Sequence, residues 1–593
     1  MQESEIYNLI EDVRVGNLPR RAFIQQMLSL GLTVSMASVM LMNAGVVQAQ
    51  SATAYKPIKR GGGGALRLMF WQGPTLLNPH FATGQKDVEG SRIFYEGLTA
   101  WDADANLIPV LAAEIPSREN GGLAADGKSV VWKLKKGVTW HDGTPFTADD
   151  VVFNWQYASD PAGGTVTVGN YLDLKYEKID THTIRVVFNQ ATPFWPGSYS
   201  GSPLIPRHLF AAYMGAKSRD APANLRPVGT GPFKFVEFKP GDMVRAEINT
   251  NYHMPNRPHF DTLELKGGGE AVSAARAVLQ TGEFDFGWNL QVEDEILKRM
   301  ESGGKGRVVI AHGGHVEFIE LNYTDPNVEI EGERAHPKSR HPVFSDPVVR
   351  QAMSLLIDRQ GVQTFVYGRA GVATANWLNN PPRYHSSNMK FEFNIDKANA
   401  LLEGAGWLRG SDGVREKGGR KLKFLFQTSV NSPRQKVQAV VKQACQKAGI
   451  ELELKSVTAA VFFSSDVGNP DTVGKFWADI QMLQLTRAPD PERFMQKFLS
   501  WEVASKANKW QSRNNGRWRS DDYDKAYRAA QFELDPVKRA ALFIRMNDIV
   551  CSDNYILPLV YRPGVSGVGN KLVAPLSGWG DNLALLHHWY RET

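Results

Sequence analysis

The chain has 593 residues, more than one hydrophobic core normally holds, so two or three domains are expected. Hydrophobic residues make up 42% and charged residues 22% of the sequence, which is typical of a soluble globular protein. The net charge of +6 is small for this length, and the basic residues form no stripe with interleaved aromatic residues, so no nucleic-acid partner is expected.

The first 49 residues have the features of an export signal. Arg20-Arg21 precede a weakly apolar run over residues 27–47, which small and polar residues dilute. The run ends in Val47-Gln48-Ala49, a pattern typical of a cleavage site. We therefore predict a twin-arginine signal peptide over residues 1–49 and a periplasmic mature protein. An uncleaved anchor is the alternative, because the run is long enough to span a bilayer. No cysteine lies near the cut, so a lipoprotein is not expected.

A flexible, glycine-rich leader over residues 50–64 precedes the first predicted strand, residues 65–71. The string GLAADGKS, residues 122–129, matches the phosphate-loop pattern letter for letter. A phosphate loop joins a buried strand to a helix, whereas strand periodicity follows Ser129. The string is therefore interpreted as a turn that begins a hairpin.

Short strands and turns are predicted over residues 93–200, with one helix that begins at Thr147. A second helix is predicted over residues 346–360, where Asp346 is placed to cap it and Pro347 stands in its first turn. Strands and helices alternate through residues 394–460, which indicates α/β lobes.

The sequence offers no enzyme signature. It has no serine nucleophile elbow and no histidine pair at metal-ligand spacing, so no catalytic residue, metal site or cofactor is expected. The two cysteines, Cys445 and Cys551, lie on apolar faces of predicted helices and are expected to be buried thiols. Their pairing stays open, because a disulfide needs Cα atoms within about 7 Å.

Five segments in order along the chain resemble one family of binding proteins. They are YEGLTAWDADANLIPVLAAEIP (95–116), WKLKKGVTWHDGTPFTADDVVFNW (132–155), VGTGPFKFVEFKPGD (228–242), LQTGEFDF (279–286) and FSDPVVRQAMSLLIDR (344–359). Together they are similar to the family 5 extracellular solute-binding proteins, the oligopeptide- and dipeptide-binding components of ABC importers. The resemblance covers essentially the whole mature chain.

The resemblance implies an α/β, two-lobe periplasmic-binding-protein fold with a hinge. Lobe I is expected to contain residues 65–95, 205–315 and 553–593, with an extra subdomain at 96–204, and lobe II residues 316–552. The chain is expected to cross to lobe II near 313–322 and to return near 553–558. A monomer would close on its solute and deliver it to permease subunits in the inner membrane, while separate subunits hydrolyse ATP.

One departure from the family pattern concerns the ligand. In the peptide binders, an acidic residue three positions before an Asp-Pro pair binds the amino group of the peptide. Here Asp490-Pro491 is present, but Arg487 stands three positions before it. A guanidinium there favours a carboxylate or phosphate. Two alternatives remain: Arg487 forms a structural salt bridge, or a one-residue shift makes Asp490 the partner of the ammonium group.

Further candidates for ligand contact lie in loops where strands end. Aromatic faces with a few amide groups suit a polar organic solute. These candidates are Trp71, Gln72, Trp288, Asn289, Asn322, Tyr323 and Trp377. The solute itself stays open among a peptide, an amino-acid–sugar conjugate, an oligosaccharide and haem.

The predicted function is the substrate-binding component of an ABC importer that captures a peptide-like or other polar organic solute. The alternatives are a secreted hydrolase, for which no catalytic constellation is found, and a periplasmic chaperone or receptor with the same fold.

Overall fold

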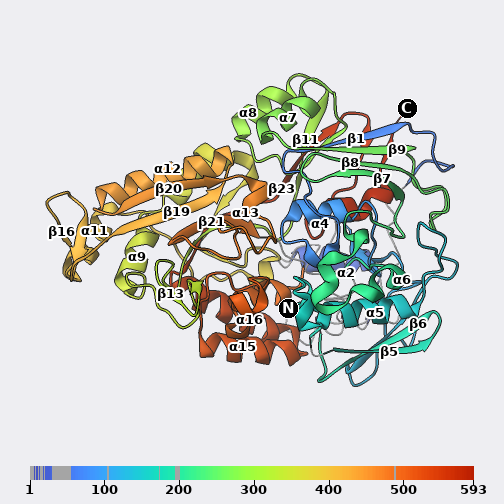
Figure 1. The fold of residues 1–593 in the computed structure, drawn as a ribbon, viewed down its shortest axis with the longest axis horizontal. Helices are drawn as coiled ribbons and strands as arrows, with labels where there is room; N and C mark the ends of the chain where they lie inside the picture. Colours follow the sequence, from blue (N-terminus) through green and yellow to red (C-terminus); the bar gives the residue numbers. More distant parts are fainter. Residues whose placement is uncertain are drawn as a thin grey trace.

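The computed structural model describes residues 55–592 apart from 103–105, 173, 194–200 and 486–488, together with some positions between 6 and 29. The described residues form two lobes, each built around its own β-sheet (Figure 1). The predicted signal segment lies outside the described residues from position 30 onward. Within the described parts of the chain, none of the helices combines the length and the apolar character needed to cross a membrane.

The sheet of lobe I collects strands from distant parts of the sequence. Its order is β11-β23-β10-β1-β9-β8-β7, and β1 pairs in parallel with both β9 and β10. The strands are β1 (Ala65–Phe70), β7 (Phe233–Lys239), β8 (Met243–Ile248), β9 (Thr262–Gly267), β10 (Phe286–Gly287), β11 (Gly306–Ala311) and β23 (Gly564–Gly569). Helices α7 (Ala271–Leu279) and α8 (Asp294–Glu301) lie at one end of this sheet, near β11 (Figure 1).

A subdomain between β1 and β7 extends lobe I. It contains a three-stranded sheet, β4 (Ser129–Lys133), β6 (Thr183–Phe188) and β5 (Leu174–Asp180), in the order β4-β6-β5. Helix α5 (Ala148–Ser159) begins at Thr147, where a capping box forms with Asp150. Buried side chains such as Trp132 belong to the same core as β1, so the subdomain is packed firmly onto lobe I.

The phosphate-loop-like string is a turn. Gly127 has a φ of +66° and strand β4 follows at Ser129, where a phosphate loop would begin a helix. The geometry therefore agrees with the interpretation as the start of a hairpin.

The sheet of lobe II has the order β15-β22-β12-β21-β19-β20. Its strands are β12 (Val316–Leu321), β15 (Val372–Ala373), β19 (Lys423–Ser429), β20 (Glu451–Val457), β21 (Ile480–Leu485) and β22 (Ile556–Tyr561). Helix α12 (Ser432–Lys447) covers β19 and β20 (Figure 1) and buries the face that carries Val437, Val441 and Cys445. Helices α15 (Asp521–Phe532) and α16 (Pro536–Ser552) pack against each other.

Helix α9 (Pro347–Leu355) shows how local chemistry sets an element of lobe II. The side chain of Asp346 accepts a hydrogen bond from the backbone N–H of Val348 at 3.0 Å, and Pro347 occupies the first turn. The predicted start is therefore confirmed, while the helix ends at Leu355, five residues before the predicted end.

Two short crossings join the lobes. Residues 312–315 connect β11 of lobe I to β12 of lobe II, and residues 562–563 connect β22 of lobe II to β23 of lobe I. The return is later than the predicted 553–558, because β22 pairs antiparallel with β12 and so belongs to lobe II. That pairing joins residues more than two hundred positions apart, which the local sequence pattern does not reveal.

The two cysteines do not pair with each other. Cys445 and Cys551 are both free and buried. Burial raises the pKa of the Cys551 thiol to about 12, and it also raises the pKa of Cys445. Both are therefore inert thiols that fill space in lobe II.

Candidate functional site

A cavity of about 490 Å³ lies between the two lobes. Lobe I contributes residues from 72, 84–92, 288–291 and 577–582, including helix α4 (Gln85–Ser91). Lobe II contributes residues from 483–485, 489–497 and 510–515, including the short helix α14 (Glu492–Met495). A solute in this cavity would contact both lobes at once, which is how hinge closure is coupled to binding.

A buried charge network lies at the hinge side of the cavity. The carboxylate of Glu317 accepts from Arg434 Nε at 2.5 Å and lies 3.5 Å from Arg562 Nη1. Arg562 also donates to Asn289 Oδ1 at 2.7 Å. Glu317 and Arg434 belong to lobe II and Asn289 to lobe I, so Arg562, in the return crossing, connects the two lobes.

The loops after β1 and β10 bring several predicted residues together. Gln72 and Trp288 line the cavity, and Trp288 stacks on Phe70 with ring centroids 4.9 Å apart. The Nε2 amide of Gln72 is buried and has no hydrogen-bond partner among the described residues. Trp71 lies behind this wall, with its indole N–H donating to the Asn289 carbonyl at 2.8 Å.

Asn289 is held in an uncommon backbone conformation at the cavity wall. Its φ is +51°, a region that asparagine tolerates better than most residues. Its side chain lines the cavity and is oriented by the hydrogen bond from Arg562. The loop geometry therefore presents an amide group to the cavity.

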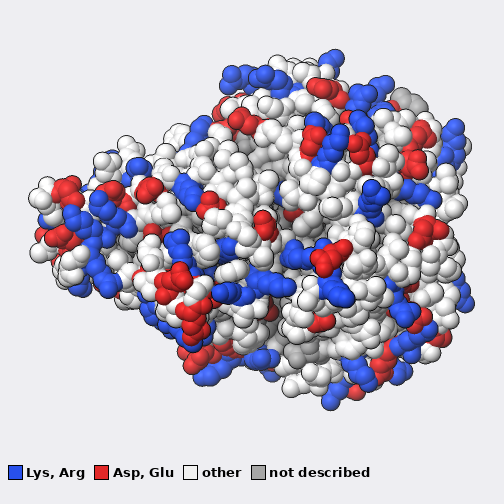
Figure 2. Space-filling view, viewed as in Figure 1, with Lys and Arg blue, Asp and Glu red and all other residues white. Residues whose placement is uncertain are grey.

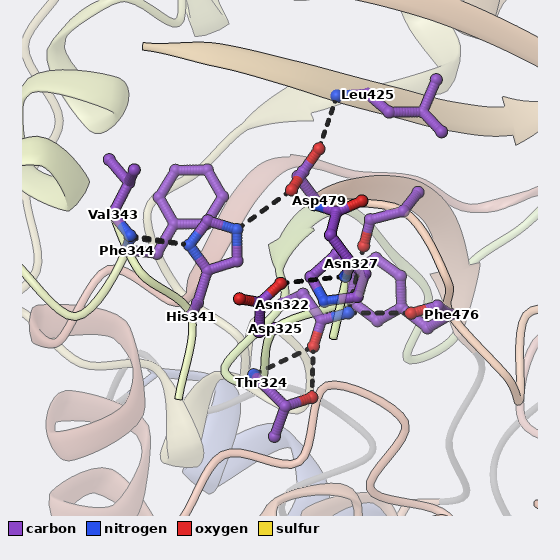
Figure 3. A network of polar contacts seen from close by, with 12 residues as sticks. Asn322, Thr324, Asp325, Asn327, His341, Val343, Phe344, Leu425, Phe476 and Asp479 are labelled. Atoms are coloured by element: carbon purple, nitrogen blue, oxygen red, sulfur yellow. Dashed lines mark hydrogen bonds and ion pairs between the residues drawn. The ribbon is translucent and has the colours of Figure 1, made fainter. Parts of the chain in front are cut away.

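Asn322 and Tyr323 lie elsewhere, at the end of β12 within lobe II. Asn322 has no exposed surface and donates to the carbonyls of Phe476 and Ala478 at 2.8 and 3.0 Å. Figure 3 shows it in a polar network with His341 and Asp479, well supplied with protein partners. The ring of Tyr323 packs against Tyr555 at 4.9 Å between centroids, so these two residues organise the lobe and do not line the cavity.

Trp377 is part of the lobe II core. It is 1% exposed and stacks on Phe494 at 4.6 Å between ring centroids. Phe494 itself lines the cavity, so Trp377 supports the wall from one layer behind.

Arg487 lies outside the described residues, whereas Asp490 lines the cavity. The carboxylate of Asp490 lies 2.7 Å from Arg539 Nη2 of helix α16 and accepts from the backbone N–H of Glu492 at 3.0 Å. Asp490 thus already has a positively charged partner from the protein.

Three acidic residues of the wall, Glu89, Glu492 and Asp581, were not singled out from the sequence. Burial, and then the charge of Asp581, raises the pKa of Glu89 to about 7. Burial also raises the pKa of Glu492. Glu89 on α4 accepts from Trp288 Nε1 at 3.3 Å and from the backbone N–H of Leu583 at 2.8 Å. Isolated Glu residues in short helices give no local signal that the fold will bury them.

Two arginines of the wall, Arg493 on α14 and Arg513 in the loop before α15, were also not predicted. Both stand in polar stretches, ERF and SRNN, that read as ordinary surface sequence. Among the described residues, no group of three or more His, Cys, Asp or Glu side chains is arranged to hold a metal ion.

Two lobes with separate sheets, two short crossings and a cavity between them define a bilobed solute-binding protein. The family described as "Bacterial extracellular solute-binding proteins, family 5 Middle" matches residues 106–506 of this chain. This match spans more than half of the chain, so the chain belongs to the family 5 extracellular solute-binding proteins.

Relatives in sequence agree with this membership. The oligopeptide-binding protein AppA of Bacillus subtilis is 29% identical over 395 residues, which cover 65% of this chain and 67% of AppA. The glutathione-binding protein GsiB of Pectobacterium atrosepticum is 24% identical over 386 residues, covering 65% and 68% of the two chains.

Solved structures share the fold. AppA from Bacillus subtilis in complex with a nonapeptide has a TM-score of 0.77 at 24% identity, covering 91% of this chain and all of AppA. MoaA from A. tumefaciens R10 in complex with mannopinic acid has a TM-score of 0.74 at 21% identity, covering 90% of this chain and all of MoaA. The protein is thus a solute-binding component of an ABC importer, and the hydrolase and chaperone alternatives are not favoured.

Proposed function

We propose that this protein captures a polar organic solute in the cavity between its lobes without using the free amino terminus of a peptide as the anchor. The observation that carries this proposal is that the acidic side chains of the cavity wall already form hydrogen bonds or ion pairs within the protein. The cavity lining contains four of them among the described residues, Glu89, Asp490, Glu492 and Asp581.

Each of these acids is already engaged by the protein. Glu89 accepts from Trp288 and Leu583, and Asp490 is paired with Arg539. Glu492 accepts from Gln496 Nε2 at 3.0 Å. Asp581 lies 2.7 Å from Arg92 Nε. A ligand ammonium group would therefore share each of these carboxylates with a protein donor, and at Asp490 and Asp581 it would also meet an arginine of like charge.

The position of the missing acid supports the same proposal. Arg487 stands where the peptide binders carry the acid that receives an amino group, and a guanidinium there repels an ammonium. Other proteins with this fold hold a nonapeptide and mannopinic acid, so the fold itself does not restrict the ligand to peptides. We propose that Gln72, Trp288, Asn289 and Arg487 contact the solute.

The proposal also covers the export of the protein, its oligomeric state and its docking partner. The Arg20-Arg21 pair and the cleavage pattern support export by the twin-arginine route to the periplasm, without lipid attachment. We expect a monomer that docks on the permease. Positive and negative side chains are interspersed over the face shown in Figure 2, which fits docking on a protein better than binding to a polyanion.

Native mass spectrometry of the mature protein, purified without denaturation, tests the proposal. We expect a retained small solute that is released on unfolding and then identified by fragmentation. Peptides of mixed sequence held equally well by an Arg487→Ala variant would overturn the ligand assignment. A wild-type protein that neither retains nor rebinds any solute would overturn the binding function.

A further inference from the structure

Two arginines of the cavity wall have side chains without a partner among the described residues. The guanidinium groups of Arg493 and Arg513 form neither a hydrogen bond nor an ion pair within this part of the chain, and Nη2 of Arg513 is buried. The other cations of the wall contrast with them: Lys86, Arg92, Arg434, Lys497 and Arg562 each lie within 4 Å of a carboxylate. Arg383, which also lacks an ion pair, lies over the ring of Tyr384 at 4.7 Å.

Arg493 and Arg513 are close enough to repel each other. Burial, and then the charge of Arg513, lowers the pKa of Arg493 to about 9. The charges of Asp581 and Glu492 act in the opposite direction, but Asp581 is already paired with Arg92, and Glu492 accepts hydrogen bonds from Gln496 and Tyr527. Both side chains are half-buried, and neither forms an ion pair within the described part of the chain. Two like charges in such a partly desolvated site are unfavourable, and an anion between them relieves that cost.

Arg513 lies beside the subdomain of lobe I. A Cβ atom added to Gly169 of the subdomain would lie 3.2 Å from Gln496 Oε1, 3.5 Å from Arg513 Nε and 3.6 Å from Glu502 Oε1. The subdomain backbone at Gly169 therefore approaches the Arg513 side chain closely, and Thr167 and Ser202 of the same subdomain line the cavity. An anion held by Arg493 and Arg513 would therefore lie against both lobes.

We propose that Arg493 and Arg513 together bind an anionic group of the solute, a carboxylate or a phosphate. Guanidinium groups match the geometry of these oxyanions through paired N–H donors. This inference rests on the proposed function and adds the charge of the solute to it. It uses two residues other than Arg487, so it does not depend on the position outside the described residues.

Small anions test the site directly. Wild-type protein is unfolded and refolded to remove solute, and its unfolding temperature is measured with millimolar glutarate, inorganic phosphate or chloride at equal ionic strength. Glutarate or phosphate is expected to stabilise the protein more than chloride does. If glutarate raises the unfolding temperature more than phosphate does, the anionic group of the solute is a carboxylate. If phosphate raises it more, the group is a phosphate.

Single variants assign the effect to the two arginines. Arg493→Gln and Arg513→Gln are each expected to weaken binding of the effective anion about 10- to 100-fold. The exposed Arg519→Gln is the matched control and should bind as wild type. Each cavity variant should also raise the unfolding temperature of the solute-free protein, because it removes one of two repelling charges. A purely structural arginine would lower that temperature.

The outcomes separate this inference from the proposed function. No stabilisation beyond chloride, or equal binding by both cavity variants, overturns the anion site. If the wild-type protein and both variants still retain the same solute in native mass spectra, the binding function stands while the anion site falls. If the wild-type protein retains and rebinds no solute, the binding function itself fails.

Discussion

Glu317 shows at the scale of a residue how much of the lobe interface depends on one carboxylate. It has no exposed surface, and it neutralises Arg434 and Arg562, which are themselves almost fully buried. Removing one partner from a buried ion pair leaves an uncompensated charge in a medium that solvates it poorly. The same carboxylate therefore supports both the core of lobe II and the return crossing.

We expect Glu317→Gln to lower the free energy of unfolding by about 3–5 kcal/mol, as for other broken buried pairs. Chemical denaturation of solute-free protein measures this change. The control is Glu264→Gln, because Glu264 pairs with Arg245 at 3.1 Å on the exposed surface of lobe I. That change should cost at most about 1 kcal/mol. Equal effects of the two substitutions would contradict the role given to Glu317.

A second prediction at this scale concerns pH. Burial lowers the pKa of His80 from 6.5 to about 4, and its ring lies 2.6 Å from Thr167 and 2.9 Å from Asn154. The unfolded chain therefore takes up a proton near pH 6.5 that the folded chain takes up only near pH 4. The stability that His80 contributes is complete above about pH 6.5 and is lost as the pH falls toward 4.

This shift corresponds to about 3 kcal/mol over that interval. We expect His80→Gln to flatten the decline of unfolding free energy between pH 6.5 and 4 relative to wild type, whatever its effect at pH 7.5. His182→Gln, in a turn of the subdomain, is the control. An unchanged slope in the His80 variant would show that this histidine does not titrate with folding.

At the scale of the element, the crossing at residues 312–315 depends on a close backbone approach. A Cβ atom on Gly313 would lie 1.5 Å from the carbonyl oxygen of Gly578. Only glycine permits this contact, in which residues 313 and 578 form a parallel bridge between the crossing and the C-terminal segment of lobe I. The crossing is thus positioned by a segment that follows it by more than two hundred and fifty residues.

Gly313→Ala should force these backbones apart. We expect a loss of about 1–3 kcal/mol in unfolding free energy, as for other overpacked sites, together with weaker solute binding. Urea unfolding and titration with the solute recovered from wild type measure the two effects. Gly404→Ala is the matched control, since a Cβ there meets nothing within 4 Å. A Gly313 variant as stable as that control would contradict the close approach.

The sequence predicts such elements well where the signal is local. The cap and proline at Asp346-Pro347, the apolar face of the Cys445 helix and the alternation after Ser129 all lie within a few residues, and the structure has the helices and strand there. Local patterns do not reveal that Ile556–Tyr561 pairs with β12.

The candidate site was harder to predict for the same reason. Strand ends at Gln72, Trp288 and Asn289 face the cavity, but Asn322 and Tyr323, also at a strand end, point into lobe II. Which side of a sheet a strand end faces depends on packing between distant segments. Arg493 and Arg513 could be recognised as candidate ligand contacts only from the structure, because the fold places them against the same cavity without forming ion pairs among the described residues.

At the scale of the whole molecule, the lobes are joined by two short segments and by polar contacts beside them. Ser432 of lobe II donates to Glu293 of lobe I at 2.8 Å, and Arg562 reaches Asn289. Away from the hinge the contacts between the lobes are longer: Arg219 lies 3.4 Å from Ser465, Thr83 lies 3.5 Å from Gln511, and Thr192 donates to the carbonyl of Gln531 at 3.2 Å. This asymmetry favours opening about the hinge side, with the solute shifting the equilibrium toward the closed form.

Solute removal should therefore change both shape and stability. We expect solute-free protein to have a larger radius of gyration in X-ray scattering and to unfold more easily. Adding back the recovered solute at about 100 times its Kd should restore about 2.7 kcal/mol. A radius of gyration independent of solute would contradict hinge closure.

The interleaving of the two lobes along the chain has a consequence during biosynthesis. Strand β23 lies between β11 and β10, and Trp589 is fully buried in the core of lobe I. Residues 316–561 of lobe II are continuous and can assemble as they leave the ribosome, whereas lobe I must wait for its last strand. Strand β1, translated before all of lobe II, is therefore among the last to reach its final packing, and solute capture begins only after β23 has joined the sheet.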